Sequence, residues 1–212
     1  FNKLAAKPVL ISTVNPDVRV KVARNLLNEY GYFNGATAYE LVPDKKDPRK
    51  AKIAYQVTMN PPYTIDSVYY VRMRNRVDSL LPRMSSERLL RKGDNFNVVR
   101  LQAERERIAD MLRDHGYYYF RPEYMVYQAD TTITPGKVSL RVVPKEGMPR
   151  NALRPWKLGK VDFYLNGYRN EPPTDSIRYK DLTIHFEGKL RVRPSVLYNR
   201  LYFLPGDRYS QM

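Results

Sequence analysis

The stretch LLNEYGYF at residues 26–33 returns 85 positions later as MLRDHGYY at residues 111–118. With the same offset, KIAYQV at 52–57 aligns with KVSLRV at 137–142 without a gap. In each copy a helix-like pattern ends at a glycine, Gly31 or Gly116, that is followed by an aromatic residue. A period of 85 residues is too long for a solenoid repeat and suits a small domain that occurs in tandem.

Composition and charge narrow the class of protein. The chain has 212 residues, of which 42% are hydrophobic and 28% charged, so it can form cores and is not disordered by composition. Its net charge of +15 favours polyanions such as nucleic acid, anionic lipid or lipopolysaccharide, or simply makes a solvated basic surface. The absence of cysteine excludes disulfides and thiolate chemistry. No apolar run approaches the roughly 18 residues of a membrane helix.

The complete unit of the repeat has the predicted order strand, helix, helix, strand, strand. We expect a strand at 63–71 and a short helix at 85–92 that ends at Gly93. A longer helix at 98–115 begins after Asn97 or Asn95 and ends at Gly116, with arginine and glutamate side chains covering its polar faces. Strands at 118–128 and 137–143 complete the unit.

The chain is expected to hold three modules, two of them incomplete. The first, at 1–60, lacks its first strand and has a helix at 18–30 and strands at 32–42 and 51–59. The second, at 61–146, is complete. The third, at 147–212, stops before its second helix and comprises a linker (147–158), a strand (160–165) similar to 64–69, an insertion (166–176), a strand (177–186) and a short helix (194–202). Since both ends fall inside a unit and no signal peptide opens the chain, we expect a piece of a longer protein.

A second sequence signal repeats before the position of each second helix. GDNFN at 93–97 and GDRYS at 206–210 share the pattern Gly-Asp-x-aromatic-Asn/Ser, of which residues 7–12 keep only a trace. Gly93 and Gly206 are predicted to end a helix, and Phe96 and Tyr209 to anchor the loop in the core. The following Asn or Ser is suited to begin the next helix.

In this order, the residues carry a family resemblance. LQAERERI at 101–108, followed by LRDHGYYYF at 112–120 with Gly116 and Tyr117, resembles the L-x-x-E-R-x-R-I…L-R-x-x-G-Y-Y-x-F pattern of POTRA domains in BamA/TamA-like outer-membrane proteins, particularly of Bacteroidetes-type bacteria. The resemblance implies an α+β fold of tandem β-α-α-β-β modules, each a three-stranded mixed sheet covered by two helices. The first unit's loop without glycine and the insertion at 166–176 depart from the pattern.

The resemblance also implies a location, partners and a mode of binding. It predicts an array at the periplasmic face of a Gram-negative outer membrane, soluble as a fragment, that binds unfolded outer-membrane proteins, accessory lipoproteins or periplasmic proteins and assists assembly or translocation. An extended client can pair with an unpaired sheet edge through main-chain hydrogen bonds. The first candidate edge comprises Tyr118, Tyr119, Phe120, Tyr124, Val126 and Tyr127, and the second Tyr32, Phe33, Tyr39 and Leu41.

Less specific interpretations of these residues stay open. The tyrosines can instead pack the core or the interface between modules, and the run Glu104–Arg107 can be a salt-bridged helix surface or a contact between modules. Gly31 and Gly116 are interpreted as structural.

No catalytic pattern stands out. His115 and His185 lack metal-ligand spacing, and no Walker or G-x-S-x-G motif occurs, so we expect no enzyme activity, cofactor or metal. One rival class is a basic nucleic-acid or polyanion-binding module that uses tyrosines for stacking, although the chain has no RNP-type strand or GXXG loop and no specific nucleic acid is expected. The other rival is a POTRA domain of secretion or cell-division machinery.

Overall fold

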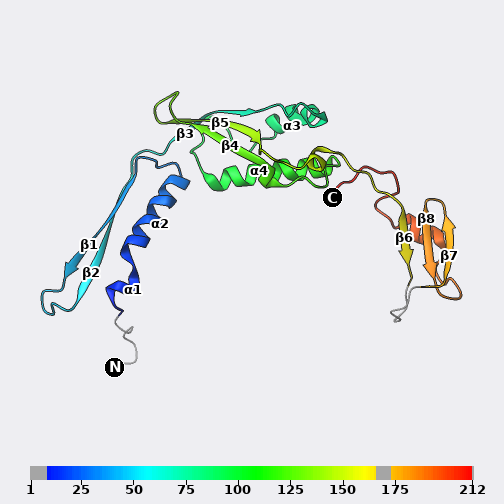
Figure 1. Ribbon diagram of the computed structural model, residues 1–212, viewed down its shortest axis with the longest axis horizontal. Coiled ribbons are helices and arrows are strands. Elements are labelled where there is room, and N and C mark those ends of the chain that lie inside the picture. Colours follow the sequence, from blue (N-terminus) through cyan, green and yellow to red (C-terminus); the bar gives the residue numbers. More distant parts are fainter. Residues whose placement is uncertain (1–8, 166–172, 212) are drawn as a thin grey trace. The chain divides into compact units, whose positions relative to one another are not determined.

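The computed structural model, drawn in Figure 1, describes residues 9–165 and 173–211. These residues divide into two compact units. Apart from undescribed positions, the first unit comprises residues 1–72, 81–105 and 126–143, and the second residues 73–80, 106–125 and 144–212. The predicted module boundaries at 60 and 146 stay a prediction. Among the described residues, no helix combines the length and the apolar character needed to cross a membrane.

The N-terminal part of the first unit is a helix lying beside a β-hairpin (Figure 1). The short helix α1 (Ile11–Val14) precedes α2 (Pro16–Glu29), which starts at a proline. Proline suits this position because the first N–H groups of a helix have no acceptor within the helix. Strands β1 (Ala36–Pro43) and β2 (Ala51–Thr58) pair antiparallel, with Tyr39 opposite Tyr55. The predicted first strand began at residue 32, but the N–H of Gly35 donates to the Tyr32 carbonyl at 2.9 Å in a turn, so the strand starts at Ala36.

A three-stranded sheet follows, with the order β3-β5-β4. It is built from β3 (Thr64–Tyr70), β4 (Met125–Asp130) and β5 (Lys137–Pro144), and β3 runs parallel to the central strand β5. Between β3 and β4 lie the 3₁₀ helix Arg76–Leu80 and the helices α3 (Leu81–Ser86) and α4 (Val98–Asp114). The predicted order strand, helix, helix, strand, strand is confirmed here. Asn97 caps α4, because its Oδ1 accepts the Val99 N–H at 2.8 Å.

Two predicted elements are displaced in this region. The helix expected at 85–92 lies at Leu81–Ser86, because the chain then turns inward to bury Leu90, and the Leu89 N–H donates to Glu104 Oε2 at 2.8 Å. The strand expected from residue 118 starts only at Met125. After Gly116 the backbone turns, with the N–H of Phe120 donating to the Tyr117 carbonyl, and Pro122–Tyr124 forms a 3₁₀ helix.

The core of the first unit is a cluster of apolar side chains from the sheet, α4 and loop 87–97: Ile65, Leu90, Phe96, Leu101, Val138 and Leu140. One charged residue lies fully buried in this unit. Glu104 was predicted on the polar surface of its helix, but it has 0% exposure and accepts the Tyr70 hydroxyl at 2.6 Å. Hydrogen bonds offset the cost of burying the carboxylate.

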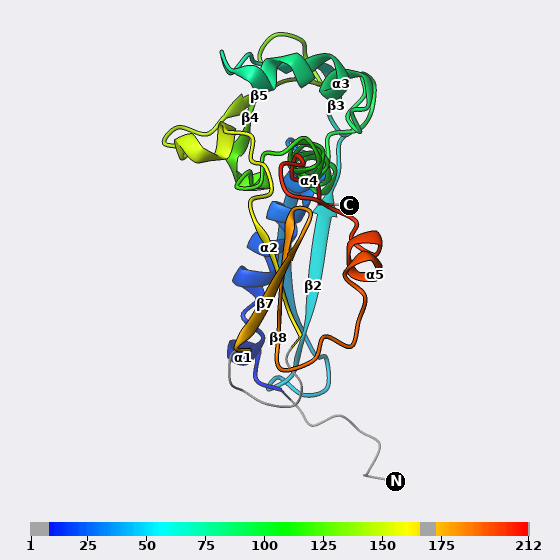
Figure 2. The same cartoon turned by 90° about the vertical axis from the view of Figure 1, so that its right-hand side faces the viewer.

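The C-terminal part of the second unit is another mixed sheet, with the order β6-β8-β7. Strand β6 (Val161–Tyr164) runs parallel to β8 (Leu182–Phe186) (Figure 1). Strand β7 (Asp175–Tyr179) pairs with β8 in an antiparallel hairpin (Figure 2). The single strand predicted at 177–186 is therefore wrong: Lys180 has φ +52° and turns the chain. Helix α5 (Pro194–Asn199) follows. Part of the predicted insertion, 166–172, lies outside the described residues.

Mixed three-stranded sheets and helices thus make up both units, and the predicted α+β class is confirmed. The third predicted module departs from the strand-helix-helix-strand-strand order, because its described elements run strand, strand, strand, helix. The predicted linker contains a 3₁₀ helix, Arg150–Leu153, whose Ala152 is buried.

Candidate functional site: sheet edges and a repeated joint

Strand β4 lies at an edge of its sheet, and among the described strands it pairs with β5 alone. The Tyr124 carbonyl just before β4 accepts the Lys145 N–H just after β5 at 2.8 Å, so this backbone group faces β5. Backbone groups of a strand alternate in direction, which turns those of Met125, Tyr127 and Ala129 away from β5. The Met125 N–H already donates to the Pro122 carbonyl, so the open part of the edge lies further along the strand. From Gln128 onward the strand is also exposed to solvent. The edge can therefore donate and accept further main-chain hydrogen bonds.

Only Val126 and Tyr127 of the first predicted edge set lie on β4. Tyr127 turns toward α4, since its hydroxyl donates to the Leu101 carbonyl at 2.8 Å. Phe120 is buried and packs edge-to-face on Tyr124, with ring centroids 5.9 Å apart. Phe120 and Tyr124, like Tyr118 and Tyr119, precede the strand.

The second predicted edge is divided in the same way. Tyr39 and Leu41 lie on β1, whereas Tyr32 and Phe33 precede it. Phe33 packs against the rings of Tyr63 and Phe96, each at 5.1 Å between centroids. The Tyr39 side chain lies near Asp17 in the first turn of α2. Its burial and the Asp17 carboxylate raise the pKa of Tyr39.

An apolar groove of about 430 Å³ lies between α2 and the hairpin and is lined by residues of both. Val18, Val22 and Leu26 line it from the helix, and Tyr55 and Val57 from β2. In the 85-residue alignment β2 corresponds to β5, which carries the parallel strand β3 along one edge. Among the described residues, β2 pairs only with β1.

Segments far apart in the sequence meet in a cluster that we call the first joint: Gly31, Tyr63 and loop 93–96. The Tyr63 N–H donates to the Gly31 carbonyl at 2.9 Å, and the Phe96 N–H donates to the Tyr63 carbonyl at 2.8 Å. Gly31 has φ +84°, and a Cβ on it would lie 3.0 Å from the Phe96 carbonyl oxygen. Glycine is therefore required both by the backbone conformation and by the close approach of the loop.

The same arrangement recurs in the second unit as the second joint: Gly116, Trp156 and loop 206–209. The Trp156 N–H donates to the Gly116 carbonyl at 2.7 Å, and the Tyr209 N–H donates to the Trp156 carbonyl at 3.1 Å. Gly116 has φ +93°, and a Cβ on it would lie 2.9 Å from Arg208 Cγ. The two joints thus use equivalent backbone atoms in the same order.

The two Gly-Asp-x-aromatic loops also bond in matching ways to the residue two positions after Tyr63 or Trp156. In the first joint, the Ile65 N–H donates to the Asp94 carbonyl at 2.7 Å, and the Gly93 N–H donates to the Ile65 carbonyl at 2.8 Å. Leu158, Asp207 and Gly206 repeat both bonds in the second joint at 2.9 Å. Each aspartate also holds its own turn, because Asp94 Oδ2 accepts the Arg91 N–H and Asp207 Oδ2 accepts the Leu204 N–H.

These contacts explain the repeated motifs and correct one alignment. Lys157 forms the bridge to Arg208 that Thr64 forms to Asn95, so Lys157 rather than Lys160 occupies the position of Thr64. The sequence patterns identified the glycines and aromatic residues but did not predict that they contact one another in the joints. A signal was present, since each Gly-aromatic turn is followed by an aromatic residue and then by the Gly-Asp loop.

Aromatic rings gather around the second joint. Tyr118 packs edge-to-face on Tyr119 and on Tyr209, at 4.9 and 4.8 Å, and Tyr119 packs on Trp156 at 5.2 Å. Tyr118 and Tyr119 of the first candidate edge therefore pack against residues of this joint.

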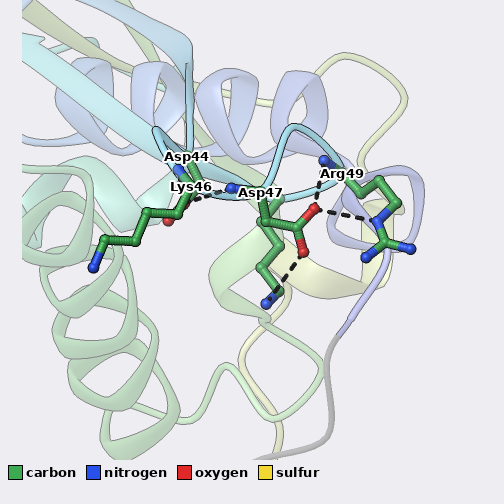
Figure 3. Close-up of polar contacts among 5 residues, drawn as sticks. Asp44, Lys46, Asp47 and Arg49 are labelled. Atoms are coloured by element: carbon green, nitrogen blue, oxygen red, sulfur yellow. Dashed lines mark hydrogen bonds and ion pairs between the residues drawn. The ribbon is translucent and has the colours of Figure 1, made fainter.

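The loop that connects β1 and β2 is closed by carboxylates (Figure 3). Asp44 Oδ1 accepts the N–H groups of Lys46 at 2.8 Å and Asp47 at 3.1 Å, and these bonds lower the pKa of Asp44. Asp47 Oδ1 accepts the Arg49 Nε–H at 3.2 Å and the Arg49 N–H at 3.1 Å, which likewise lower its pKa.

The two histidines lie apart. His115 Nδ1 donates to the Met111 carbonyl at 2.7 Å, and His185 stacks on Tyr164 at 4.5 Å with its Nε2 3.2 Å from Asp162. Within the described part of the chain, no three side chains of the metal-binding types gather in one place.

The chain resembles solved POTRA structures. No family model matches it, and no curated protein matches it. The Haemophilus influenzae BamA POTRA3-5 structure is similar over 98% of this chain and 67% of that chain, with 15% identity and a TM-score of 0.43. The N-terminal domain of Omp85 from Thermosynechococcus elongatus shares 20% identity over 92% of this chain and 66% of its own, with a TM-score of 0.31. POTRA1-3 of Omp85 from Anabaena shares 15% identity over 92% and 65%, with a TM-score of 0.35. This chain spans about two thirds of the length of these solved chains.

Proposed function

We propose that this chain is a series of POTRA modules that binds extended segments of unfolded outer-membrane proteins along β4. Its place would be the periplasmic face of the outer membrane of a Gram-negative bacterium, where it would assist assembly or translocation. The observation that carries the proposal is the open edge of β4 in the order β3-β5-β4. Binding rather than catalysis is the activity proposed.

Edge pairing suits a client that is not yet folded. An extended client strand has the same unpaired N–H and C=O groups as β4, and pairing satisfies both sets with little regard to side chains. Gln128, Ala129 and Asp130 are the exposed residues of the strand and so its most accessible part. Accessory lipoproteins or other periplasmic proteins could use the same edge.

Side chains of the predicted edge set support the strand rather than contact the client in this proposal. Tyr127 attaches β4 to α4 through the Leu101 carbonyl, and Phe120 lies in the interior. The proposal therefore transfers the contact from the aromatic side chains to the β4 main chain.

A proline at Ala129 tests the edge directly. By the alternation along β4 its N–H points away from β5, so A129P removes an outward donor and leaves the β4–β5 bonds in place. We expect crosslinking of a photoreactive group at residue 128 to an unfolded barrel protein to fall at least about fivefold, because a hydrogen bond and the close approach are lost together.

The matched control is A129V, which enlarges the side chain by two methyl groups and keeps the backbone N–H. It should crosslink like the unaltered chain, and both variants should keep the same unfolding midpoint. Equal crosslinking by A129P and A129V would contradict edge pairing at β4. Loss of binding on adding salt, with no effect of A129P, would favour the rival polyanion-binding module.

A further inference from the structure

The second joint contains a cavity of about 290 Å³ into which several polar side chains converge. Arg208 comes from the Gly-Asp-x-aromatic loop, His115 and Tyr117 flank the joint glycine, and Arg76 and Ser79 come from the 3₁₀ helix Arg76–Leu80. All five belong to the second unit. Nothing in the proposed edge pairing uses them.

The joint itself positions Arg208. Its aliphatic stem lies across Gly116, close enough that a Cβ there would be 2.9 Å from Cγ and 3.2 Å from Cδ. Its backbone is held by the bridge to Lys157 and by the bond from Tyr209 to Trp156. The guanidinium is therefore presented by a frame that does not depend on its charge.

The 3₁₀ helix contributes Arg76, Ser79 and Leu80 to the lining of the cavity. Asp78 accepts the N–H groups of Met73 at 2.7 Å and Arg74 at 3.0 Å, which fixes the turn before the helix. Ser79 Oγ donates to the Arg76 carbonyl at 2.8 Å and keeps its lone pairs free to accept. Arg76 thus enters the cavity from an anchored element.

The charge of this cavity is not balanced by the described residues. Neither Arg76 nor Arg208 forms an ion pair with any described acidic side chain. Both guanidiniums act on the buried Tyr117 hydroxyl: burial raises the pKa of Tyr117, while Arg208 and Arg76 each counter that rise. Two cations therefore face one phenol that stays protonated and can donate a hydrogen bond.

The first joint offers an internal comparison. Its cavity, also about 290 Å³, is lined by Tyr30, Tyr32 and Asn95 at the positions of His115, Tyr117 and Arg208. The arginine that lines it, Arg100, is neutralised by Asp94 at 2.9 Å. The same backbone frame thus carries free cationic charge only at the second joint.

We propose that the cavity of the second joint binds a phosphate group, held by Arg76 and Arg208 with a hydrogen bond from Tyr117. Guanidinium forks match phosphate oxygens, and a phosphate group offers more acceptor oxygens to these three donors than a carboxylate does. A bound phosphate would also screen the repulsion between the two guanidiniums. The group could belong to a soluble phosphate ester or to the headgroup of a phospholipid.

The test is a titration of the chain with pyrophosphate, followed by calorimetry and by NMR shifts of backbone amides. R208N gives the second joint the residue that the first joint has, and we expect it to weaken binding about tenfold or more, as should R76Q. R178N removes the same charge from exposed β7 and should bind as tightly as the unaltered chain. Shifts should centre on residues 116, 117 and 156.

Further binding experiments distinguish a soluble phosphate ester from a lipid headgroup, and either of these from the absence of a phosphate site. Glycerol 3-phosphate binding that is lost in R208N assigns a soluble ester, whereas binding only to phosphatidylcholine vesicles that contain phosphatidic acid, again lost in R208N, assigns a lipid headgroup. The proposal is overturned if R208N and R178N bind alike in every arm, if succinate binds as tightly as pyrophosphate, or if the shifts spread over the basic surface.

Discussion

At the residue scale, glycines with left-handed backbone have two different roles. Gly31 and Gly93 have nearly the same φ, +84° and +89°, but a Cβ at Gly31 would meet the backbone of loop 93–96, whereas a Cβ at Gly93 would meet nothing within 4 Å. Sequence alone predicted a helix-ending glycine in both places. It could not distinguish them, because the neighbour of Gly31 lies 65 residues along the chain at Phe96.

Alanine substitutions should separate the two roles. We expect G93A to lower the free energy of unfolding by about 1–2 kcal/mol, the cost of left-handed backbone for a residue with a Cβ. G31A should cost about 1–3 kcal/mol more, because the first joint must also open to admit the methyl group. Urea denaturation of both variants measures the difference. Equal losses would show that loop 93–96 does not press on Gly31.

Buried Glu104 is the second feature at this scale. Its carboxylate accepts hydrogen bonds from the Tyr70 hydroxyl and the Leu89 N–H. It therefore connects β3, α4 and the non-helical segment 87–92, which lies within the helix predicted at 85–92. The sequence pattern favoured a surface position because Arg105, Glu106 and Arg107 follow it. A buried charge is visible only once its hydrogen-bond partners are placed.

Removal of the Tyr70 hydroxyl should be costly for this reason. We expect Y70F to lower the free energy of unfolding by about 1.5–3 kcal/mol, the usual contribution of a hydrogen bond to a charged group. Y69F alters the neighbouring exposed tyrosine and should change it by less than about 0.5 kcal/mol. Thermal and urea unfolding provide the measurement, and a Y70F variant as stable as Y69F would exclude a structural role for this bond.

At the scale of elements, the predictions succeeded where a local signal decides the structure. Helices α2 and α4 follow apolar periodicity with clear ends, and β5 and β2 follow β-branched patterns. They failed where a distant contact decides: residues 118 and 119 have strong strand propensity, but after the turn at Gly116 their rings pack against Tyr209 and Trp156 of the second joint. The hairpin β7–β8 was missed because its two-residue turn, Lys180-Asp181, contains no glycine.

The β1–β2 loop is an element with a predictable response to pH. Its hydrogen bonds hold the pKa values of Asp44 and Asp47 below their ordinary value of 3.8, so the folded loop binds protons less readily than the unfolded chain. The stabilisation is therefore present above about pH 4 and is lost as the pH falls through the folded pKa values.

We expect the amides of Lys46 and Asp47 to lose their protection from hydrogen exchange as the pH is lowered below about 4, after correction for the intrinsic rate. Amides of the central strand β5 serve as the reference. In D44N the bonded form should be weakened already at neutral pH, with little further change on acidification. A loop whose protection is independent of pH in the unaltered chain would contradict this account.

At the scale of the whole molecule, the repeat in the sequence is a repeat of contacts. The segments that revealed it, LLNEYGYF and MLRDHGYY, end in the glycines on which the two joints are built. The α+β class and one complete strand-helix-helix-strand-strand series could be predicted, and so could the edge position of β4. The joints could not, because each combines segments that are separated by 30 residues or more, and no local pattern specifies their pairing.

The most direct test of the proposed function is hydrogen–deuterium exchange of the chain with and without an unfolded barrel protein. Edge pairing predicts new protection at the outward amide of Ala129 in β4, with no change in β5, which is already bonded on both sides. A client that is bound while this amide exchanges at an unaltered rate would contradict the account.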